Sequence, residues 1–364
     1  MKLNDKEKRL LDLLRANPYV TQKEIALSME LSRPAVANMI SGLQEKGYIL
    51  GKPYVLRTDA YITCIGSANM DVTLMLNDAL IKGTSNPVQG LSSYGGVIRN
   101  VAENLARLHV NVSLMSLVGD DAYGLEILSS SQTLMETFAT ETIAHESTGT
   151  YYAVIDKKGD MAYGFASMAI NEHMDRSWIL RHKKHLVMSK YIICDLNVSK
   201  EAIETLLELK EELDVPLAIV GVSGPKMSHL PDDLDVLDVL ICNVDETQTY
   251  FKTDINDASK LCQLWLDKGV KKVVVTAGIK GSYYGENNNV LHQKANDVDP
   301  SSIVDVTGAG DAFSSAFMYG IIHGYSLSEA VKLGTVNASL TIQVPHAVNP
   351  NISIKTIKEE LKKS

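Results

Sequence analysis

The sequence predicts an α/β protein built on a parallel sheet with crossover helices, preceded by a small helical domain. From residue 58 onward, short apolar runs typical of buried parallel strands alternate with amphipathic helices. The length of 364 residues suits two domains. The first 57 residues carry ten basic and six acidic residues, whereas the rest carry 25 and 38. The basic N-terminal segment (the basic head) and the acidic remainder (the body) therefore indicate two separate functions.

Composition excludes several classes of protein. The chain is 45% hydrophobic and 22% charged, which is ordinary for a globular protein and excludes a disordered or collagen-like chain. No apolar run reaches the roughly 18 residues that span a bilayer, and the charged start has no apolar signal region. The cysteines are far apart and expected to be reduced, so we expect a cytoplasmic protein without membrane contact; they are Cys64, Cys194, Cys242 and Cys262.

The basic head has the spacing of a helix-turn-helix. Residues 4–16 place four leucines on one helical face. Thr21 with Glu24 predicts a capping box for a second helix. Ser32 predicts the N-cap of a third helix, which ends at Gly47. Two helices joined by a tight turn are typical of DNA-binding modules.

Residues 48–57 predict a β-hairpin, so that residues 1–57 resemble the winged helix-turn-helix of bacterial regulators. The start of the third helix would then face the major groove of double-stranded DNA, with Ser32, Arg33, Ala35 and Asn38. Arg33 and Asn38 can read guanine or adenine edges. The alternative is a three-helix module that binds protein or dimerises.

The body, residues 58–364, contains six expected buried strands and three clear crossover helices between them. The strands are expected at 61–65, 112–117, 191–195, 217–220, 236–242 and 273–276, and the helices at 97–108, 201–213 and 256–268. Residues 148–165 predict a hairpin that turns at Lys158-Gly159. This hairpin would belong to a smaller sheet beside the main one.

The strongest chemical signal is the string Asp305-Val-Thr-Gly-Ala-Gly-Asp-Ala-Phe313, between an expected short strand at Ile303-Val304 and a helix. Glycines at a helix N-terminus leave backbone N–H groups facing an anion, and the helix dipole adds to the attraction. Asp311 lies in the same turn. A carboxylate there suits a general base that takes a proton from a hydroxyl attacking phosphorus.

This string resembles the C-terminal signature of the PfkB, or ribokinase-like, family of carbohydrate kinases. The resemblance covers roughly residues 60–360 and implies a three-layer α/β/α fold with a small β-sheet lid. It implies ATP as the phosphoryl donor with Mg²⁺, and Asp311 as the catalytic base. Gly308, Ala309 and Gly310 would form the anion hole, and Asp305 and Thr307 would contribute to a monovalent-cation site, for example for K⁺.

The acceptor side of the site is expected from two further segments. Gly95 and Gly96 allow a ligand to approach the backbone, and Asn100 supplies a donor and an acceptor for sugar hydroxyls. The segment resembles the N-terminal signature of the family, which adds Arg99 to the substrate-binding residues. Asp71, expected just past the first strand, would bind substrate hydroxyls.

The nucleotide side resembles the family in three places. Asn243 and Glu246 match its Asn-x-x-Glu motif near the phosphates, where Glu246 would hold Mg²⁺ through a bound water. Thr276, Gly278 and Gly281 resemble its nucleotide-binding turn, and Asn337 falls where the family lines the adenine pocket. The chain has no Walker A string and no dinucleotide fingerprint, which argues against both of those nucleotide folds.

Three details favour the pseudouridine-kinase branch of the family. They are Arg99 where ribokinases prefer a small residue, the run Thr84-Ser-Asn-Pro87, and the fused winged helix. The implied reaction is phosphorylation of the 5′-hydroxyl of pseudouridine. Two departures, His109 for a glycine and Gly221–Lys226 for a more acidic run, keep another nucleoside, a pentose or a hexose open.

Two other hypotheses concern the whole chain. A transcriptional regulator could use a kinase-derived domain only to sense a ligand, although a pure sensor need not keep Asp311 and its glycines. A homodimer is expected, because family members often pair through the lid sheet and winged helices usually work as dimers.

Overall fold

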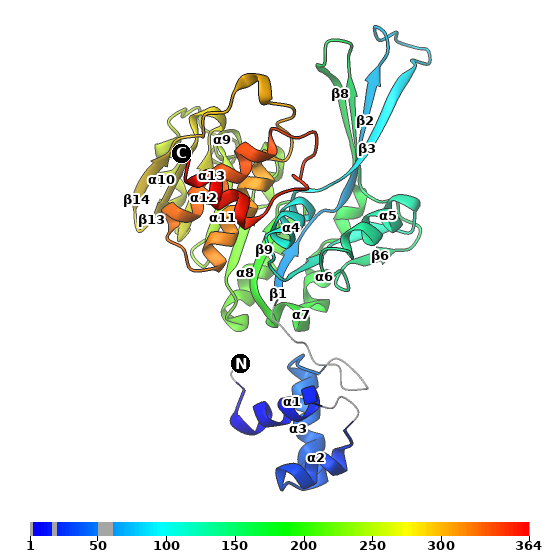
Figure 1. Ribbon diagram of the computed structural model, residues 1–364, viewed down its shortest axis with the longest axis vertical. Coiled ribbons are helices and arrows are strands. Elements are labelled where there is room, and N and C mark those ends of the chain that lie inside the picture. Colours follow the sequence, from blue (N-terminus) through cyan, green and yellow to red (C-terminus); the bar gives the residue numbers. More distant parts are fainter. Residues whose placement is uncertain (1–2, 17–19, 50–60, 364) are drawn as a thin grey trace.

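The computed structural model describes residues 3–16, 20–49 and 61–363. Figure 1 shows a small N-terminal helical unit and a larger α/β body from which a long, narrow sheet projects. No described helix is long and apolar enough to cross a membrane. All four cysteines are buried and unpaired, as the sequence predicts.

The N-terminal unit packs three helices around its own core: α1 (Asp5–Ala16), α2 (Gln22–Met29) and α3 (Arg33–Glu45). The expected capping box of Thr21 and Glu24 is present, and the Ser32 hydroxyl caps α3. Leu10, Leu14 and Ile40 are among the side chains that close the core. The predicted hairpin at 48–57 and the boundary at 57/58 lie outside the described residues from residue 50 onward.

The body is organised by one eight-stranded sheet with the order β14-β13-β12-β11-β10-β9-β1-β4. Six neighbouring strands are parallel, as expected, whereas β13 and β14 form an antiparallel hairpin at one edge. The sheet is therefore mixed, which the sequence did not predict. The strands are β1 (Tyr61–Ile65), β4 (Val112–Met115), β9 (Ser189–Asp195), β10 (Leu217–Val220), β11 (Val239–Asn243), β12 (Lys272–Thr276), β13 (Ser282–Glu286) and β14 (Asn289–Gln293).

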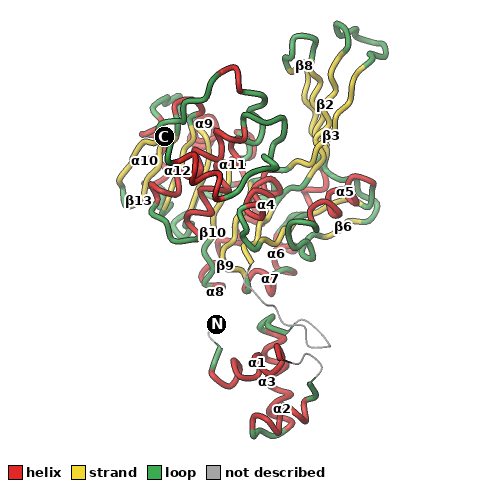
Figure 2. Tube along the Cα trace, in the orientation of Figure 1, coloured by secondary structure: helices red, strands yellow, loops and turns green. Residues whose placement is uncertain are grey.

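Helices cover both faces of this sheet and give the expected three layers (Figure 2). Successive strand residues point to opposite faces, so Ile193 joins one core and Cys194 the other. The first core packs against α4 (Val97–Arg107), α5 (Ala122–Ser131), α11 (Ala309–Ile322) and α12 (Leu327–Thr341). The second packs against α6 (Arg176–Arg181), α7 (Lys183–Val187), α8 (Lys200–Leu213), α9 (Val244–Phe251) and α10 (Ala258–Asp267).

Shorter elements complete the body. They are α13 (Ile354–Leu361), the two-stranded pair β5 (Leu117–Gly119) and β6 (Glu141–Ile143), and the 3₁₀ turns η1 (Ala169–His173), η2 (Gly224–His229), η3 (Gly278–Lys280) and η4 (Pro300–Ser302). The strand expected at Ile303-Val304 is wrong: both residues lie in an exposed loop after η4. His109 adopts a left-handed φ of 63°, a conformation that glycine reaches without strain.

The projecting sheet, which we call the lid sheet, has the order β3-β2-β7-β8. Its strands are β2 (Asn69–Leu76), β3 (Val88–Gly95), β7 (Thr150–Ile155) and β8 (Met161–Ser167). The predicted hairpin is β7–β8, with Gly159 at its turn. The strands β2 and β3 were not predicted, so Asp71 lies within a lid strand rather than in a turn after β1. The strand β3 is exposed at six of its eight residues and has no apolar alternation, whereas β2 does alternate, with Met70, Val72, Leu74 and Leu76 on one face.

Candidate active site

The candidate active site lies where the carboxyl ends of β1, β9 and β11 meet the first turns of α4 and α11. In parallel sheets this edge collects the loops that bind ligands. A single hydrogen bond joins the two helices across it: the Asn100 side-chain amide donates to the Asp311 carboxylate at 2.9 Å. Residues 211 positions apart in the sequence are thereby brought together.

The glycine turn before α11 has the geometry that an anion site needs. Gly308 is the N-cap with a left-handed φ of 78°, and a Cβ there would clash with the carbonyl of Ala347. No atom lies within 4 Å of where a Gly310 side chain would start. The first N–H groups of a helix have no acceptor within it, so this open turn can present the Gly310 amide to a phosphoryl group. The Ala309 N–H donates to the Val306 carbonyl at 3.3 Å and would exchange that bond for one to the phosphoryl group.

Asp311 follows directly in the first turn of α11. Burial of the carboxylate is the main cause that raises its pKa to about 7, and the charges of Asp195, Asp71 and Glu246 add to it. The Asn100 hydrogen bond opposes this rise. A pKa near neutrality suits a base that must accept a proton and release it again.

Asp71 faces the same space from the lid strand β2. Its carboxylate accepts a hydrogen bond from the Asn69 amide at 2.7 Å, and burial raises its pKa to about 6. A Cβ at Gly95, which pairs with Asn69 on the neighbouring strand, would clash with this carboxylate. The glycine expected for ligand approach therefore also makes room for the acid.

Arg99 lies beside the acceptor side of the site, where its charge opposes the burial-driven rise in the pKa of Asp71, but its guanidinium is held by protein partners. Its guanidinium is buried, pairs with Glu103 at 2.6 Å and lies over the Tyr94 ring. It also approaches the Asn100 side-chain oxygen at 3.4 Å. Arg99 thus supports Asn100 from behind, and its charge is largely taken up by Glu103 one helical turn away.

Asp195 is the site residue that the sequence analysis missed. It ends β9, is fully buried and accepts four hydrogen bonds: from the backbone N–H groups of Ser67, Ile98 and Asn197, and from the Asn197 amide. It therefore ties the end of β1 to the first turn of α4. Burial raises its pKa to about 6. The available signal was an acid directly after the apolar run Tyr191–Cys194.

The Asn243-x-x-Glu246 motif at the end of β11 caps the N-terminus of α9. The Asn243 and Glu246 side chains each accept from the other residue's backbone N–H, at 2.7 and 2.9 Å, and form a capping box. Glu246 is buried, and burial raises its pKa. A Cβ at Gly221 would clash with the Glu246 carboxylate, which gives a steric reason for glycine at the departure from the acidic family pattern.

The turn between β12 and β13 contains the expected nucleotide-binding residues. Thr276 ends β12 beside Asn243 on β11. Gly278 and Gly281 both have positive φ, of 56° and 87°. A Cβ at Gly281 would clash with the Gln293 carbonyl, whereas Gly278 faces open space. Backbone conformation, rather than side-chain packing, shapes this part of the site.

The remaining predicted residues are Asn337 and, just before the glycine turn, Asp305 and Thr307. Asn337 is fully buried and donates to the Ala312 carbonyl at 2.8 Å and to Asn104 at 3.3 Å. It therefore packs α12 behind the glycine turn and offers no surface to a nucleotide. Asp305 and Thr307 are exposed, and the Asp305 carboxylate accepts from the Thr307 N–H at 2.8 Å.

Comparison with known families decides the class of protein. Residues 59–354 match the model of the pfkB family carbohydrate kinases. This chain belongs to the PfkB family. Residues 3–49 match the winged helix-turn-helix DNA-binding model, so the kinase carries an N-terminal domain of that type.

Relatives and a solved structure agree with this assignment. The Escherichia coli "uncharacterized sugar kinase YeiI" is 27% identical over 96% of this chain and 97% of its own length. The E. coli pseudouridine kinase is 28% identical over 83% of this chain and 96% of its own. An Arabidopsis thaliana ribokinase structure, 21% identical, matches 84% of this chain and all of its own with a TM-score of 0.74. The chain is therefore a sugar or nucleoside kinase with a ribokinase-like α/β fold.

Kinases of this family use ATP, typically with Mg²⁺, and the residues of this PfkB kinase fit such a cation. Four acids with raised pKa values surround one space: Asp71, Asp195, Asp311 and Glu246. Among the described residues, no group of three or more His, Cys, Asp or Glu side chains is placed to hold a metal ion. Mg²⁺ takes few protein ligands and keeps its waters, so a carboxylate such as that of Glu246 would hold it through a bound water.

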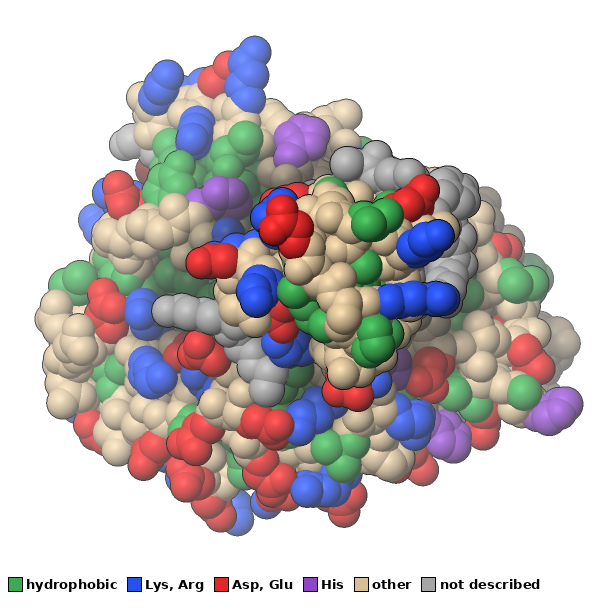
Figure 3. All heavy atoms as spheres, turned by 90° about the horizontal axis from the view of Figure 1, so that it is seen from below, with side chains coloured by type: hydrophobic (Ala, Val, Ile, Leu, Met, Phe, Trp, Pro, Cys, Tyr) green, Lys and Arg blue, Asp and Glu red, His purple; other side chains and the backbone are tan. Residues whose placement is uncertain are grey.

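The predicted DNA-reading residues lie at the start of α3. Arg33 and Asn38 are exposed, whereas the Ser32 hydroxyl is used for the helix cap, at 3.3 Å from the Ala35 N–H. Figure 3, which looks onto this end of the molecule, shows acidic and basic side chains interspersed. Recognition of DNA would thus depend on individual side chains rather than on a uniformly basic face.

Proposed function

We propose that the protein transfers the γ-phosphoryl group of ATP to the 5′-hydroxyl of pseudouridine. The observation that carries this proposal is the Asn100–Asp311 hydrogen bond beside the open glycine turn. It supports a base held next to an anion hole, which is the arrangement that transfer to an alcohol requires.

In the proposed reaction, Asp71 and Asn100 hold hydroxyls of the ribosyl group. Asp311 accepts the proton of the 5′-hydroxyl as its oxygen forms a bond to the γ-phosphorus. The bond between that phosphorus and the β,γ-bridging oxygen breaks, and ADP leaves. The Ala309 and Gly310 N–H groups stabilise charge on the transferring group.

The nucleotide side completes the proposed site. Thr276, Gly278 and Gly281 would contact the nucleotide, with Asn243 near its phosphates, and Glu246 would hold Mg²⁺ through a bound water. Mg²⁺, when bound with ATP, neutralises the charge of the phosphates. We also propose that K⁺ binds beside the glycine turn, because Asp305 and Thr307 expose oxygen atoms there and hard cations prefer oxygen ligands. Comparison of rates in KCl and NaCl tests it.

A nucleoside, rather than a free sugar, is supported by a hollow next to the acceptor side. This hollow has a volume of about 770 Å³ and lies between the end of β8, η1 and η2. Asn171, Asn197, Lys226 and His229 are among its lining residues. The Lys226 ammonium can donate to a carbonyl of a uracil ring, whereas the Asn171 and Asn197 amides already donate to Ser67 and Asp195.

Hydrogen bonds connect the hollow to the acid that would hold the sugar. Asn171 donates to the Ser67 hydroxyl at 3.5 Å, which contacts Asn69 at 3.4 Å, and Asn69 donates to Asp71. A ribosyl group at Asp71 would therefore place its base towards the hollow. The similarity to the E. coli pseudouridine kinase supports pseudouridine among the nucleosides.

A coupled assay of ADP release with Mg²⁺ tests this proposal across pseudouridine, uridine, ribose and fructose phosphates. We expect the highest kcat/KM with pseudouridine, and we expect Lys226→Ala to raise KM for pseudouridine but not for ribose. If turnover is highest with ribose or a hexose, phosphoryl transfer from ATP is supported but a nucleoside is not the substrate. No turnover on any of them would favour the ligand-sensing regulator.

A second function, DNA binding, is favoured by the exposed Arg33 and Asn38 on α3. Arg33→Ala should weaken operator binding in a gel-shift assay, with a specific loss of about 1–3 kcal/mol if the side chain reads a guanine. Lys23→Ala on α2 is the matched control. Equal affinities of wild type and Arg33→Ala at several salt concentrations would contradict groove reading.

Homodimerisation is supported by the outer face of the lid sheet. Asp71, Tyr151 and Ala166 are paired across three strands and share one face. Phe165 and Tyr163 alternate with Ala166, so they lie on the opposite face, where they are 56% and 42% exposed and stack on each other. An apolar surface of this kind is typical of an interface. Sedimentation of Phe165→Lys should show a monomer.

A further inference from the structure

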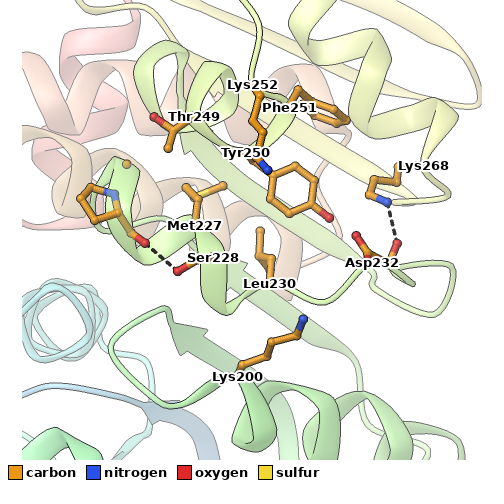
Figure 4. A pocket seen from close by; sticks show the side chains of 12 residues that line it. Lys200, Met227, Ser228, Leu230, Asp232, Thr249, Tyr250, Phe251, Lys252 and Lys268 are labelled. Carbon is orange, nitrogen blue, oxygen red and sulfur yellow. Dashed lines mark hydrogen bonds between the residues drawn. The ribbon is translucent and has the colours of Figure 1, made fainter.

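A second cavity lies away from the Asp311 site, between η2 and the last turn of α9. Its volume is about 550 Å³. Met227 and Leu230, both buried, and the half-buried Tyr250 are among the side chains that form its apolar lining. Figure 4 shows Tyr250 facing the cavity from α9, with Leu230 beside it.

Three lysines and one acid line this cavity: Lys200, Lys252, Lys268 and Asp232. Lys268 donates to the Asp232 backbone carbonyl at 2.6 Å and lies 5.7 Å from the Tyr250 ring centre. Within the described part of the chain, the ammonium groups of Lys200 and Lys252 have no hydrogen-bond or ion-pair partner. A surplus of positive charge in a protein of net charge −9 marks the cavity as a site for an anion.

The cavity shares a helix with the nucleotide side of the active site. Glu246 lies in the first turn of α9, and Thr249 and Tyr250 line the cavity from the last turn. The segment from β10 to η2 touches this helix at both ends. A Cβ at Gly221 would clash with Glu246, and a Cβ at Gly224 would come within 2.8 Å of the Thr249 hydroxyl. A ligand that moves η2 would therefore also press on Glu246.

We propose that this cavity binds a small organic phosphate monoester and that its occupation changes the activity of the kinase. The phosphate would contact the ammonium groups of Lys200 and Lys252, and the organic part would lie on Tyr250 and Leu230. Coupling runs through α9 to Glu246, so the expected effect is on KM for ATP. Lys200 lines both this cavity and the hollow proposed for the nucleobase, so KM for the acceptor is measured beside KM for ATP. Lys252 lines this cavity and not that hollow, so its variant isolates the cavity, whereas the effect on KM for ATP rests on the role proposed for Glu246.

Calorimetric titration of the full chain tests the binding. The probes are inorganic phosphate, ribose 5-phosphate and uridine 5′-monophosphate, with wild type, Lys252→Glu and Lys260→Glu. We expect at least one monoester to bind wild type about tenfold more tightly than Lys252→Glu. Lys260→Glu, which makes the same charge change at an exposed position on α10 outside the cavity, should match wild type.

Initial rates with and without the bound monoester test the coupling. We expect KM for ATP to change in wild type and in Lys260→Glu, and to stay constant in Lys252→Glu, whose rate without the probe is unchanged. Equal affinity of Lys252→Glu and wild type, or no binding of any probe, would overturn the site. Tight binding of inorganic phosphate alone would overturn the assignment to an ester, since Tyr250 and Leu230 would then contribute nothing.

Discussion

The acceptor side and the nucleotide side of the active site are built in opposite ways. On the acceptor side, Asp71, Asp195 and Asp311 accept hydrogen bonds from the protein's own side chains or backbone. On the nucleotide side, Gly278 and Gly310 face open space, and Ile279 between the turn glycines is 96% exposed. The acceptor side is therefore preorganised by hydrogen bonds between distant segments, whereas the nucleotide side is preorganised by backbone conformation and by the local Asn243–Glu246 capping box.

The largest effect should come from the acid that lies between the two sides. Asp311→Asn removes the base but keeps the shape, so kcat should fall at least ~10³-fold while the affinity for ATP stays nearly unchanged. In wild type, kcat/KM for the acceptor should rise with pH through about 7, because the carboxylate must be ionised to accept a proton. Full activity of Asp311→Asn would refute its role as the base.

A smaller loss is expected when the acceptor side loses its internal support. In Asp195→Asn an N–H₂ group must face backbone N–H donors, so the first turn of α4 should shift and carry Asn100 with it. Displacements of this kind cost about 10²-fold in rate. Removal of the Asp195 charge should also lower the pKa of Asp311. The acid limb of the pH–rate profile should therefore shift to lower pH.

A shift of the acid limb to lower pH in Asp195→Asn would distinguish a positioning role of Asp195 from a general loss of structure. Asp195→Asn is expected to keep its affinity for ATP, because the nucleotide side does not depend on this carboxylate. A variant with lower ATP affinity and an unmoved pH profile would show damage to the whole fold instead.

The nucleotide side should respond to backbone changes in a graded way. Gly281→Ala introduces a Cβ that clashes with the Gln293 carbonyl at a positive φ, whereas Gly278→Ala has a positive φ but open space. A Gly-to-Ala change at a positive φ costs about 1 kcal/mol or more. We expect KM for ATP to rise about tenfold in Gly281→Ala and less in Gly278→Ala, and KM for the acceptor to stay constant. Equal effects of the two changes would contradict the packing at Gly281.

The smallest effect concerns stability. The pKa of Asp311 is raised to about 7 in the folded protein from the ordinary 3.8, so the folded state holds this proton more tightly than the unfolded chain does. Stability contributed by the protonated group is present at low pH and is lost as pH rises through about 7. Asp311→Asn should therefore have a higher Tm than wild type at pH 8, with the difference shrinking towards pH 4. If Asp311→Asn has a lower Tm than wild type at pH 8, the ionised Asp311 carboxylate does not destabilise the fold and the prediction is wrong. The other acids that face this position, Asp71, Asp195 and Glu246, are the same in both proteins.

The two sides also differ in how far they could be predicted from the sequence. Gly308, Gly310 and Asp311 are contiguous, and their geometry follows from local rules for a glycine turn before a helix. The same holds for the Asn243–Glu246 capping box and for the Thr21 and Ser32 caps of the N-terminal unit. The burial of Asn337 does not follow from local rules, because its partner Ala312 lies 25 positions away on α11. The Arg99–Glu103 ion pair, in contrast, follows a local i,i+4 rule.

The sequence by itself determined the alternation of strands and helices, the helix-turn-helix spacing and the phosphoryl-transfer turn, because periodicity, caps and glycines act over a few residues. Only the tertiary structure decided that β2 and β3 build the lid sheet, that β13–β14 closes the main sheet antiparallel, and that Asp195 ties β1 to α4. The bond from Ser67 to Asp195 joins residues 128 positions apart, which only chain topology brings together. The β2–β3 and β12–β13 pairs join residues 12 to 26 and 6 to 14 positions apart, and there the sheet that each strand joins depends on packing against the rest of the fold.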